Sequence, residues 1–278
     1  MTAAPSRRAV LGALALAALA PAALAAPAAH PWPRWQASDE SSGRTIDHGA
    51  WDRFLARYLR RGGDGINRVA YRRVLPADRE ALSLYVATLA GLPITSYRRA
   101  EQQVYWINLY NALTLRTVLE HYPVASVLDI RLQGAAFHGP WSGKLLHIEG
   151  EQVSLDDIEH RILRPFWHDP RLHYALCTAT LGSPNLAPHA YTLDARDAML
   201  DAGAHTYVNQ PRGAEIVAGR LDVSSLYVWY KSDFGGSDRG VIEHLRRYAA
   251  APLAAALAEQ SRIAGDAYDW SLNDAKGI

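Results

Sequence analysis

Residues 105–112 read Tyr-Trp-Ile-Asn-Leu-Tyr-Asn-Ala, and they place two carboxamides inside one of the most apolar stretches of the chain. At 100° per residue, Asn108 and Asn111 share a helix face with apolar neighbours, whereas Arg116 and Glu120 point toward the other side. Asn is a poor helix former and is costly to bury unless its amide is hydrogen-bonded. We therefore expect both carboxamides to hold a polar group in place, and we assign them to ligand binding.

Length and composition predict an ordinary globular protein. The chain has 278 residues, enough for one sizeable core and marginal for two domains, and 49% of them are hydrophobic. Its 29 basic residues against 28 acidic ones provide no electrostatic case for nucleic-acid binding. Because Cys177 is the only cysteine, an intrachain disulfide and a thiolate metal cluster are both excluded.

Residues 1–25 predict an export signal peptide. Arg7 and Arg8 precede an Ala/Leu-rich stretch, which resembles a twin-arginine signal, and Ala23-Leu24-Ala25 offers small residues to a signal peptidase. Pro21 and Pro27 interrupt the apolar run, which argues against a permanent membrane span, although an uncleaved anchor is the alternative. Removal of the signal changes the net charge from +1 to −1, since it contains two arginines and no acid. We expect a periplasmic or secreted protein with no stable membrane span.

Apolar periodicity and turn residues divide the rest of the chain into helices and short strands. Residues 26–45 predict a linker or a loosely draped arm, and residues 46–273 a single globular domain. The predicted helices cover 48–61, 77–90, 97–121, 155–164, 194–208, 224–230, 239–250 and 252–261. The predicted strands lie at 144–148, 152–153, 171–177, 214–223 (a hairpin turning at Gly219) and 262–270. Strands and helices do not alternate in βαβ units, so we expect an α+β fold, mostly helical with short strands and hairpins.

The predicted helix 155–164 carries the most informative acid. On a helical wheel Glu159 falls at the centre of the apolar face, with His160 rotated toward its edge. An inward carboxylate needs a cationic partner or has a raised pKa, and either condition suits general acid–base catalysis. A structural ion pair with an arginine is the alternative. Asp157 is expected to close a capping box with Ser154, and Pro165 to end the helix.

The predicted strand 171–177 places His173 and Cys177 on one side, roughly 13 Å apart at about 3.3 Å per residue. That separation is too large for a nucleophile–base pair. If Cys177 is a nucleophile, its base is therefore His138 or His160. The alternative is that Cys177 is only a small buried hydrophobe.

A Gly-Ser-Pro-Asn turn follows the predicted strand, within Thr178–Asn185. Such turns often present backbone amides to ligands. Ser183 is either a nucleophile or a turn residue, and no Gly-x-Ser-x-Gly elbow is present. The candidate catalytic residues are Glu159, His173, Cys177 and Ser183. The further candidate ligand-binding residues are His138, His160 and Thr178.

The eleven histidines show no tight metal-ligand spacing such as His-Glu-x-x-His. His138, Glu159, His160 and His173 can still converge in space, so a metal-dependent enzyme is an alternative. We assign no metal ligand and expect no cofactor.

Five blocks of the chain resemble, in order, the domain-of-unknown-function family numbered 547. They are Tyr105–Ala112, Ser154–Arg164, Asp169–Leu186, Tyr227–Gly235 and Tyr268–Asn273. The resemblance covers residues 48–273 and implies no particular activity.

One departure from the family pattern lies in the 178–184 region, where members usually read Cys-Ala-Ser-x-x-Cys-Pro. Thr178 and Ser183 stand in place of the two cysteines, and Cys177 lies one residue earlier. The joint loss is what a dispensable structural pair predicts. If the second cysteine is a nucleophile in the family, Ser183 is its weaker replacement or marks a degenerate site.

Two functions fit these residues. The first is an exported domain that binds a small polar ligand or a peptide in a pocket lined by Asn, Glu and His. The second is a hydrolase or acyl transferase acting on an envelope substrate, with an arrangement like that of papain-like hydrolases or transglutaminases. An imidazole nitrogen within about 4 Å of Ser183 Oγ or Cys177 Sγ would favour the enzyme.

Overall fold

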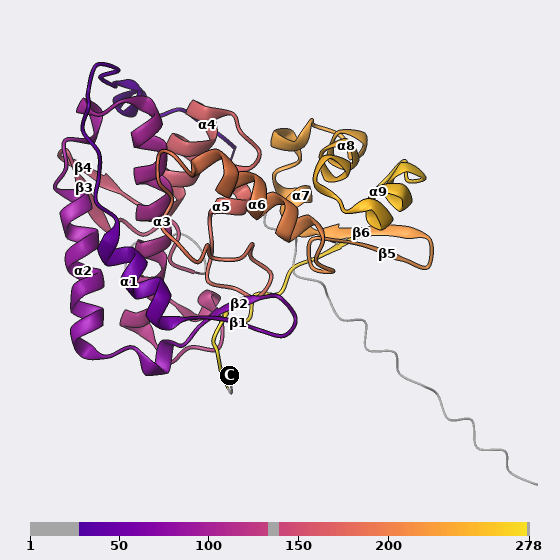
Figure 1. Cartoon of the computed structure of the whole chain (residues 1–278), viewed down its shortest axis with the longest axis horizontal. Coiled ribbons are helices and arrows are strands. Elements are labelled where there is room, and N and C mark those ends of the chain that lie inside the picture. Colours follow the sequence, from indigo (N-terminus) through magenta and orange to yellow (C-terminus); the bar gives the residue numbers. More distant parts are fainter. Residues whose placement is uncertain (1–27, 133–138, 277–278) are drawn as a thin grey trace, which may run out of the picture.

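Helix α3 (Arg99–His121) is the centre of the larger of two lobes (Figure 1). The computed structural model describes residues 28–132 and 139–276. Almost every side chain of α3 is buried, including Asn108 and Asn111, whereas Glu120 is exposed and Arg116 is half-buried. The predicted helix and its inward carboxamides are confirmed.

Helices α1 (Gly49–Tyr58) and α2 (Pro76–Ala90) pack beside α3 (Figure 1). The prediction of a helix through residue 61 is wrong at its end, because β1 (Leu59–Arg61) turns back as an antiparallel hairpin with β2 (Asn67–Val69). Gly65 has a φ of +76°, a conformation that favours glycine, and allows this turn. The predicted second hairpin is confirmed as β3 (Leu146–Ile148) and β4 (Glu151–Val153).

The predicted helix 155–164 contains a π-helical segment, η5 (Asp157–Leu163), followed by α4 (Arg164–Trp167). The expected capping box is confirmed, since Asp157 accepts the Ser154 N–H at 2.9 Å and donates its own N–H to Ser154 Oγ at 3.1 Å. Pro165 does not end the helix. It lies in the first turn of α4, where its missing N–H is tolerated.

The wider π-helical turn also corrects the helical wheel. The N–H of Arg164 bonds to the carbonyl of Glu159, five residues earlier rather than four. His160 therefore lies inward rather than at the edge, and both Glu159 and His160 are buried.

The predicted strand 171–177 is wrong, because the chain forms the short helix α5 (Leu172–Ala175) there. Asp169 accepts the N–H of Arg171 through its side chain and the N–H of Leu172 through its carbonyl. Asp-Pro before an apolar run is a helix-start signal, and here it overrides the alternation that suggested a strand.

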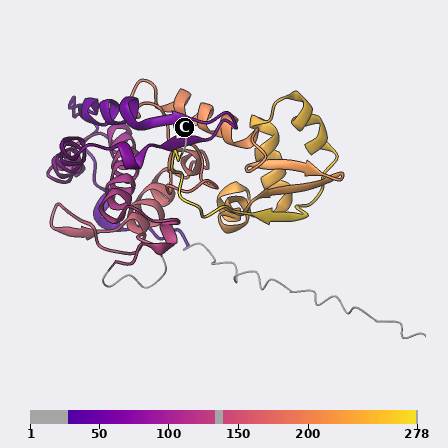
Figure 2. The same cartoon turned by 90° about the horizontal axis from the view of Figure 1, so that it is seen from below.

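The smaller lobe contains a three-stranded sheet and short helices (Figure 2). Strand β5 (Ala214–Val217) pairs antiparallel with β6 (Arg220–Ser224), which pairs parallel with β7 (Gly265–Ala267). The helices are α7 (Ser225–Trp229), η6 (Lys231–Phe234), α8 (Asp238–Tyr248) and α9 (Ala251–Ala258). These elements confirm the predicted hairpin at Gly219 and the predicted helices, and β7 is shorter than expected.

The two lobes have separate hydrophobic cores, and α6 (Arg196–Val208) joins them. Its Leu200 belongs to the core of the larger lobe, and its Tyr207 to that of the smaller lobe. The architecture is an α+β single domain, as predicted.

The remaining short helices belong to the larger lobe. They are η1 (Pro33–Gln36), η2 (Tyr71–Arg73), η3 (Ile94–Ser96) and η4 (Val127–Asp129). In η1 Trp35 is buried, and Trp32 donates its N–H to the carbonyl of Arg161, so the described part of segment 26–45 packs on the larger lobe. None of the helices in the described ranges has both the length and the apolar character that a membrane span requires.

Candidate functional site

His173 lies between two carboxylates at the junction of the lobes. Its Nε2 is 2.8 Å from Asp233 Oδ2, and its Nδ1 is 3.7 Å from Glu159 Oε1. Asp233 comes from η6, whereas Glu159 and His173 come from η5 and α5. The ring of His173 stacks on that of Tyr230, with centroids 4.2 Å apart. We call these residues, together with Asp156, His160 and Arg164, the junction network.

Arg164 connects the carboxylate of Asp233 to a second histidine. Its Nε and Nη2 donate to both oxygens of Asp233 at 2.6 and 3.1 Å, and its Nη1 lies 3.1 Å from His160 Nδ1. Burial lowers the pKa of His160, against the opposing effect of Glu159. His160 is therefore a neutral acceptor beside a permanent cation.

The carboxylates of the network differ in how readily they ionise. Partial burial acts to raise the pKa of Asp233, but His173 and Arg164 hold it well below its usual range. Burial, and then the charge of Glu159, raise the pKa of Asp156 to about 7. Asp156 Oδ1 lies 3.7 Å from His160 Nε2. The network thus combines an ionised carboxylate with one that titrates near neutral pH.

Tyrosines cover the buried end of the network. Tyr110 donates its hydroxyl to Glu159 Oε2 at 3.4 Å, and the Tyr230 hydroxyl also bonds to Glu159. Asp233, Asp156 and Tyr230 are partly exposed, and the side chains of the two acids are 20% and 31% exposed. A ligand would therefore meet the network at these two acids.

The two carboxamides of α3 bind main-chain groups. Asn108 donates to the carbonyl of Tyr191 at 2.8 Å and accepts its N–H at 2.9 Å. Asn111 donates to the carbonyl of Ala175 and accepts the N–H of Cys177, both at 2.8 Å. The polar groups that they hold belong to the chain's own backbone, and Asn111 fixes the end of α5, the helix that carries His173.

The Thr178–Ser183 turn forms a second polar cluster next to the junction network. Thr178 donates its N–H to Ser183 Oγ at 3.0 Å, and Ser183 donates its N–H to Thr180 Oγ1 at 3.1 Å. The hydroxyl of Tyr268 lies 3.0 Å from both threonine hydroxyls.

Neither proposed nucleophile has a histidine partner in the described part of the chain. Cys177 Sγ accepts from Asn273 Nδ2 at 3.8 Å, and burial raises the pKa of its thiol, the opposite of what a reactive thiolate needs. The Ser183 hydroxyl is fully buried in its turn. His138, the other histidine predicted as a base for Cys177, lies outside the described residues.

One known protein family is similar to the central part of the chain. Residues 94–208 match the model of a family described as "Protein of unknown function, DUF547". This segment is similar to the DUF547 family. No curated protein and no solved structure matches the chain.

The segment that matches the DUF547 model contains most of the junction network, but not all of it. Glu159, His160, Arg164 and His173 lie within residues 94–208, whereas Asp233 and Tyr230 lie beyond them. Arg164 and Asp233 lie within the blocks that resemble the family, but neither is among the predicted site residues. The sequence does contain a signal for Arg164. A buried Glu159 beside histidines needs a cationic partner, and Arg164 lies four residues after His160, about one helical turn.

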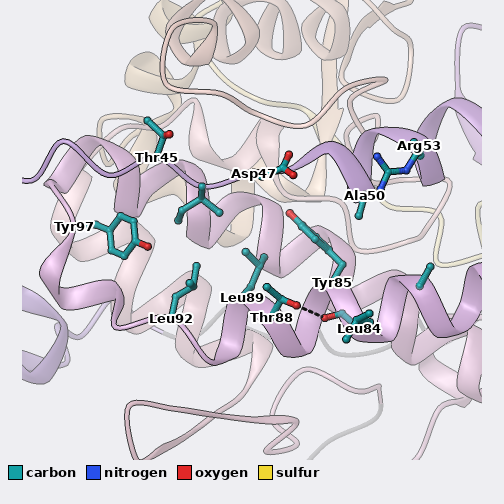
Figure 3. Close-up of a pocket in the computed structure, with 12 residues that line it drawn as sticks. Thr45, Asp47, Ala50, Arg53, Leu84, Tyr85, Thr88, Leu89, Leu92 and Tyr97 are labelled. Atoms are coloured by element: carbon teal, nitrogen blue, oxygen red, sulfur yellow. Dashed lines mark hydrogen bonds between the residues drawn. The ribbon is translucent and has the colours of Figure 1, made fainter.

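A hollow of about 370 Å³ lies between α1 and α2, away from the predicted site residues (Figure 3). It is lined mainly by apolar side chains, among them Leu84, Tyr85, Leu89 and Tyr97. None of the predicted site residues lines it. Within the described ranges, no three His, Cys, Asp or Glu side chains are arranged to hold a metal ion.

Proposed function

We propose that this chain is an exported domain that binds a small polar ligand or a peptide at the junction network. The observation that carries the proposal is the chain of contacts Glu159–His173–Asp233, where segments far apart in the sequence meet between two hydrophobic cores. Four of the five blocks that carry the family resemblance contribute a residue to this network or its tyrosine cover.

A contribution to folding stability does not by itself explain why this protein buries so many charged groups together. Removing charged groups from water costs several kcal/mol for each ion, and well-packed apolar residues in their place are often as stable or more stable. Segment η5 adds a π-helical distortion, a feature that recurs at functional sites. Both features support a binding role for the residues that they place together.

The chemistry of the solvent-facing edge suggests how a ligand is held. Asp233 is ionised, and Asp156 gains its charge only near neutral pH. An amide, hydroxyl or amine group of a ligand can donate to these carboxylates in place of water. His173, positioned by Glu159 behind Asp233, orients the carboxylate that would accept this bond.

A thermal-shift screen of small polar compounds and short peptides tests the proposal. A true ligand should raise the melting temperature of the wild type, and its effect should disappear in Asp233→Asn, which keeps the shape of the side chain but removes its charge. Asp197→Asn is the matched control, because Asp197 also pairs with arginines but is 63% exposed on α6. Ligands whose shifts survive in both Asp233→Asn and His173→Gln would contradict the site.

The second candidate is a hydrolase or acyl transferase that acts on an envelope substrate. One observation favours it: a histidine that contacts an orienting carboxylate at 2.8 Å is the base–orienter pair of many hydrolases. Labelling of folded protein with a fluorophosphonate or iodoacetamide probe, lost in His173→Gln, would support a covalent mechanism. An unlabelled wild type would leave binding as the better reading.

A metal-dependent enzyme is the third alternative from the sequence, and the donor groups of the described residues do not favour it.

A further inference from the structure

The arginines of the chain are concentrated in one short segment. Residues 53–79 contain eight arginines and only two acids, although the whole chain is nearly neutral, with 29 basic and 28 acidic residues. The rest of the protein is therefore acidic. Such asymmetry indicates a local interaction surface that the net charge conceals.

Tyr58, at the end of α1, brings these arginines together. Its carbonyl accepts the N–H of Ala70, and its hydroxyl accepts the N–H of Leu75 at 3.2 Å. The short helix η2, which carries Arg72 and Arg73, is thereby held at both ends against α1. Arg57, Arg60 and Arg61 flank Tyr58 along the chain, at the end of α1 and in β1. We call Arg57, Arg60, Arg61, Arg72, Arg73 and Leu75 the arginine face.

Few acids neutralise this face. Arg57 pairs with Asp78 at 3.1 Å, and Asp64, at the tip of the hairpin, pairs with Arg68 at 2.6 Å. Arg61, Arg72 and Arg73 are exposed, and none of them forms an ion pair with an acid of the described ranges.

Apolar side chains protrude beside the arginines. Leu75, two residues after Arg73, is 47% exposed, and Leu84 is 67% exposed on α2. Ala77, Ala81 and Ala87 lie on the same solvent face of α2, on which Glu80 is the only charged residue among the fully exposed ones. Leu84 also borders the hollow between α1 and α2 (Figure 3). A helix that presents apolar residues to water next to cations has the pattern of an interfacial membrane contact.

We propose that the arginine face and the solvent side of α2 dock on an anionic phospholipid surface. The guanidinium groups would bind lipid phosphates, for which their planar fork is well suited, and Leu75 and Leu84 would enter the interfacial region. Nucleic acid offers the same phosphates but no apolar layer for these leucines. This proposal is independent of the function proposed for the junction network.

Co-sedimentation of the full chain with vesicles tests the proposal. Vesicles of phosphatidylcholine alone are compared with vesicles that also contain phosphatidylglycerol. Each arginine near an anionic surface contributes a factor of about five to binding. Arg72→Glu/Arg73→Glu should therefore bind the anionic vesicles at least about thirtyfold more weakly than the wild type does. On neutral vesicles the two proteins should behave alike, since any contribution of residues 1–25 is common to both.

The matched control is Arg246→Glu/Arg247→Glu, which reverses an equivalent exposed pair on α8 and should leave vesicle binding within about twofold of the wild type after allowance for net charge. Leu75→Ser should weaken binding to anionic vesicles but not to duplex DNA. Equal losses for both arginine pairs would overturn the proposal. So would tighter binding to DNA than to vesicles with no effect of Leu75→Ser, which would assign the face to nucleic acid.

Discussion

At the scale of single residues, Glu159 and Asn111 are buried polar groups that have hydrogen-bond or charged partners. Glu159 is buried among Tyr110, Tyr230 and His173, and Asn111 is buried against the backbone of α5. Substitution at either position should leave buried partners without a hydrogen bond, which costs more than the original contact contributed.

Glu159→Leu should lower the free energy of unfolding by roughly 3–5 kcal/mol, because it leaves a buried histidine and two hydroxyls without their carboxylate. Glu159→Gln should cost less, since its amide oxygen still accepts from Tyr110. Urea denaturation measures both. The control is Glu243→Leu at an exposed pair with Arg239, expected to change stability by less than about 0.5 kcal/mol. An unchanged midpoint for Glu159→Leu would remove this residue from the buried network.

Asn111→Ala should destabilise the protein by about 2–4 kcal/mol, because it leaves the Ala175 carbonyl and the Cys177 N–H unpaired in the core. Asn209→Ala is a suitable comparison, since the half-buried Asn209 also bonds to backbone groups that water can reach. Its cost should stay below about 1 kcal/mol. Similar losses for the two variants in thermal or urea unfolding would show that burial of the Asn111 bonds is not what matters.

At the scale of elements, the π-helical segment η5 places Glu159 and His160 inward together and leaves Asp156 partly buried beside them. The capping box at Ser154 holds the start of this helix, and Asp157 also pairs with Lys144 and Arg161. Gathering several acids in one turn raises the pKa of Asp156, through burial first and then through the charges of Glu159 and Asp157.

The raised pKa of Asp156 makes stability depend on pH. An aspartate in the unfolded chain loses its proton near pH 4, whereas Asp156 in the folded protein keeps it until about pH 7. The folded state thus binds more protons between these values, so this residue makes stability fall as the pH rises through that window. Asp233 acts oppositely, since its stabilising charge is lost only as the pH falls below the usual range of an aspartate.

Asp156→Asn should therefore stabilise the protein by on the order of 2 kcal/mol above about pH 8, and by much less near about pH 4. Urea midpoints across this pH range measure the difference. Asp269→Asn, near the Thr178–Ser183 turn, provides a comparison outside the network. A gain for Asp156→Asn that is the same at every pH would contradict a raised pKa.

At the scale of the whole molecule, the junction network is a polar connection between two hydrophobic cores. Asp233 of the smaller lobe accepts from Arg164 and contacts His173 of the larger lobe. Helix α6 provides the apolar part of the connection through its two ends.

Asp233→Ala should loosen the smaller lobe before the larger one, because it removes two hydrogen bonds from Arg164 and the carboxylate contact with His173 across the junction. Hydrogen exchange should accelerate by roughly tenfold or more in β5 to α9, with a smaller change in α3. Asp197→Ala on α6 is the control and should leave the pattern unaltered. Uniform acceleration in both lobes would mean that they unfold as one unit.

The export by the twin-arginine route that we propose also concerns the whole chain. Arg7→Lys/Arg8→Lys keeps the charge but should leave the protein in the cytoplasm, because the route reads the arginine pair. Fractionation of cells expressing each form measures this. Arg60→Lys/Arg61→Lys, in the folded domain, should be exported normally. Unimpaired export of the lysine signal would favour the general secretory route.

Much of the fold could be predicted from local patterns. The helix 97–121, the capping box at Ser154 and the hairpin at Gly219 each depend on residues a few positions apart, and each was confirmed. The predicted strand 171–177 failed although its signal was also local, since the capping role of Asp169 outweighed the apolar alternation.

The inward position of Glu159 and the burial of both carboxamides could be predicted from periodicity, because apolar residues at helical spacing identify the buried face of a helix. What those side chains bind was decided only by the tertiary structure. Asp233 lies 60 positions from His173 along the chain, and no spacing rule connects η6 to α5. Partners of buried polar groups are chosen by the packing of distant segments, so they exist only once the two lobes have come together.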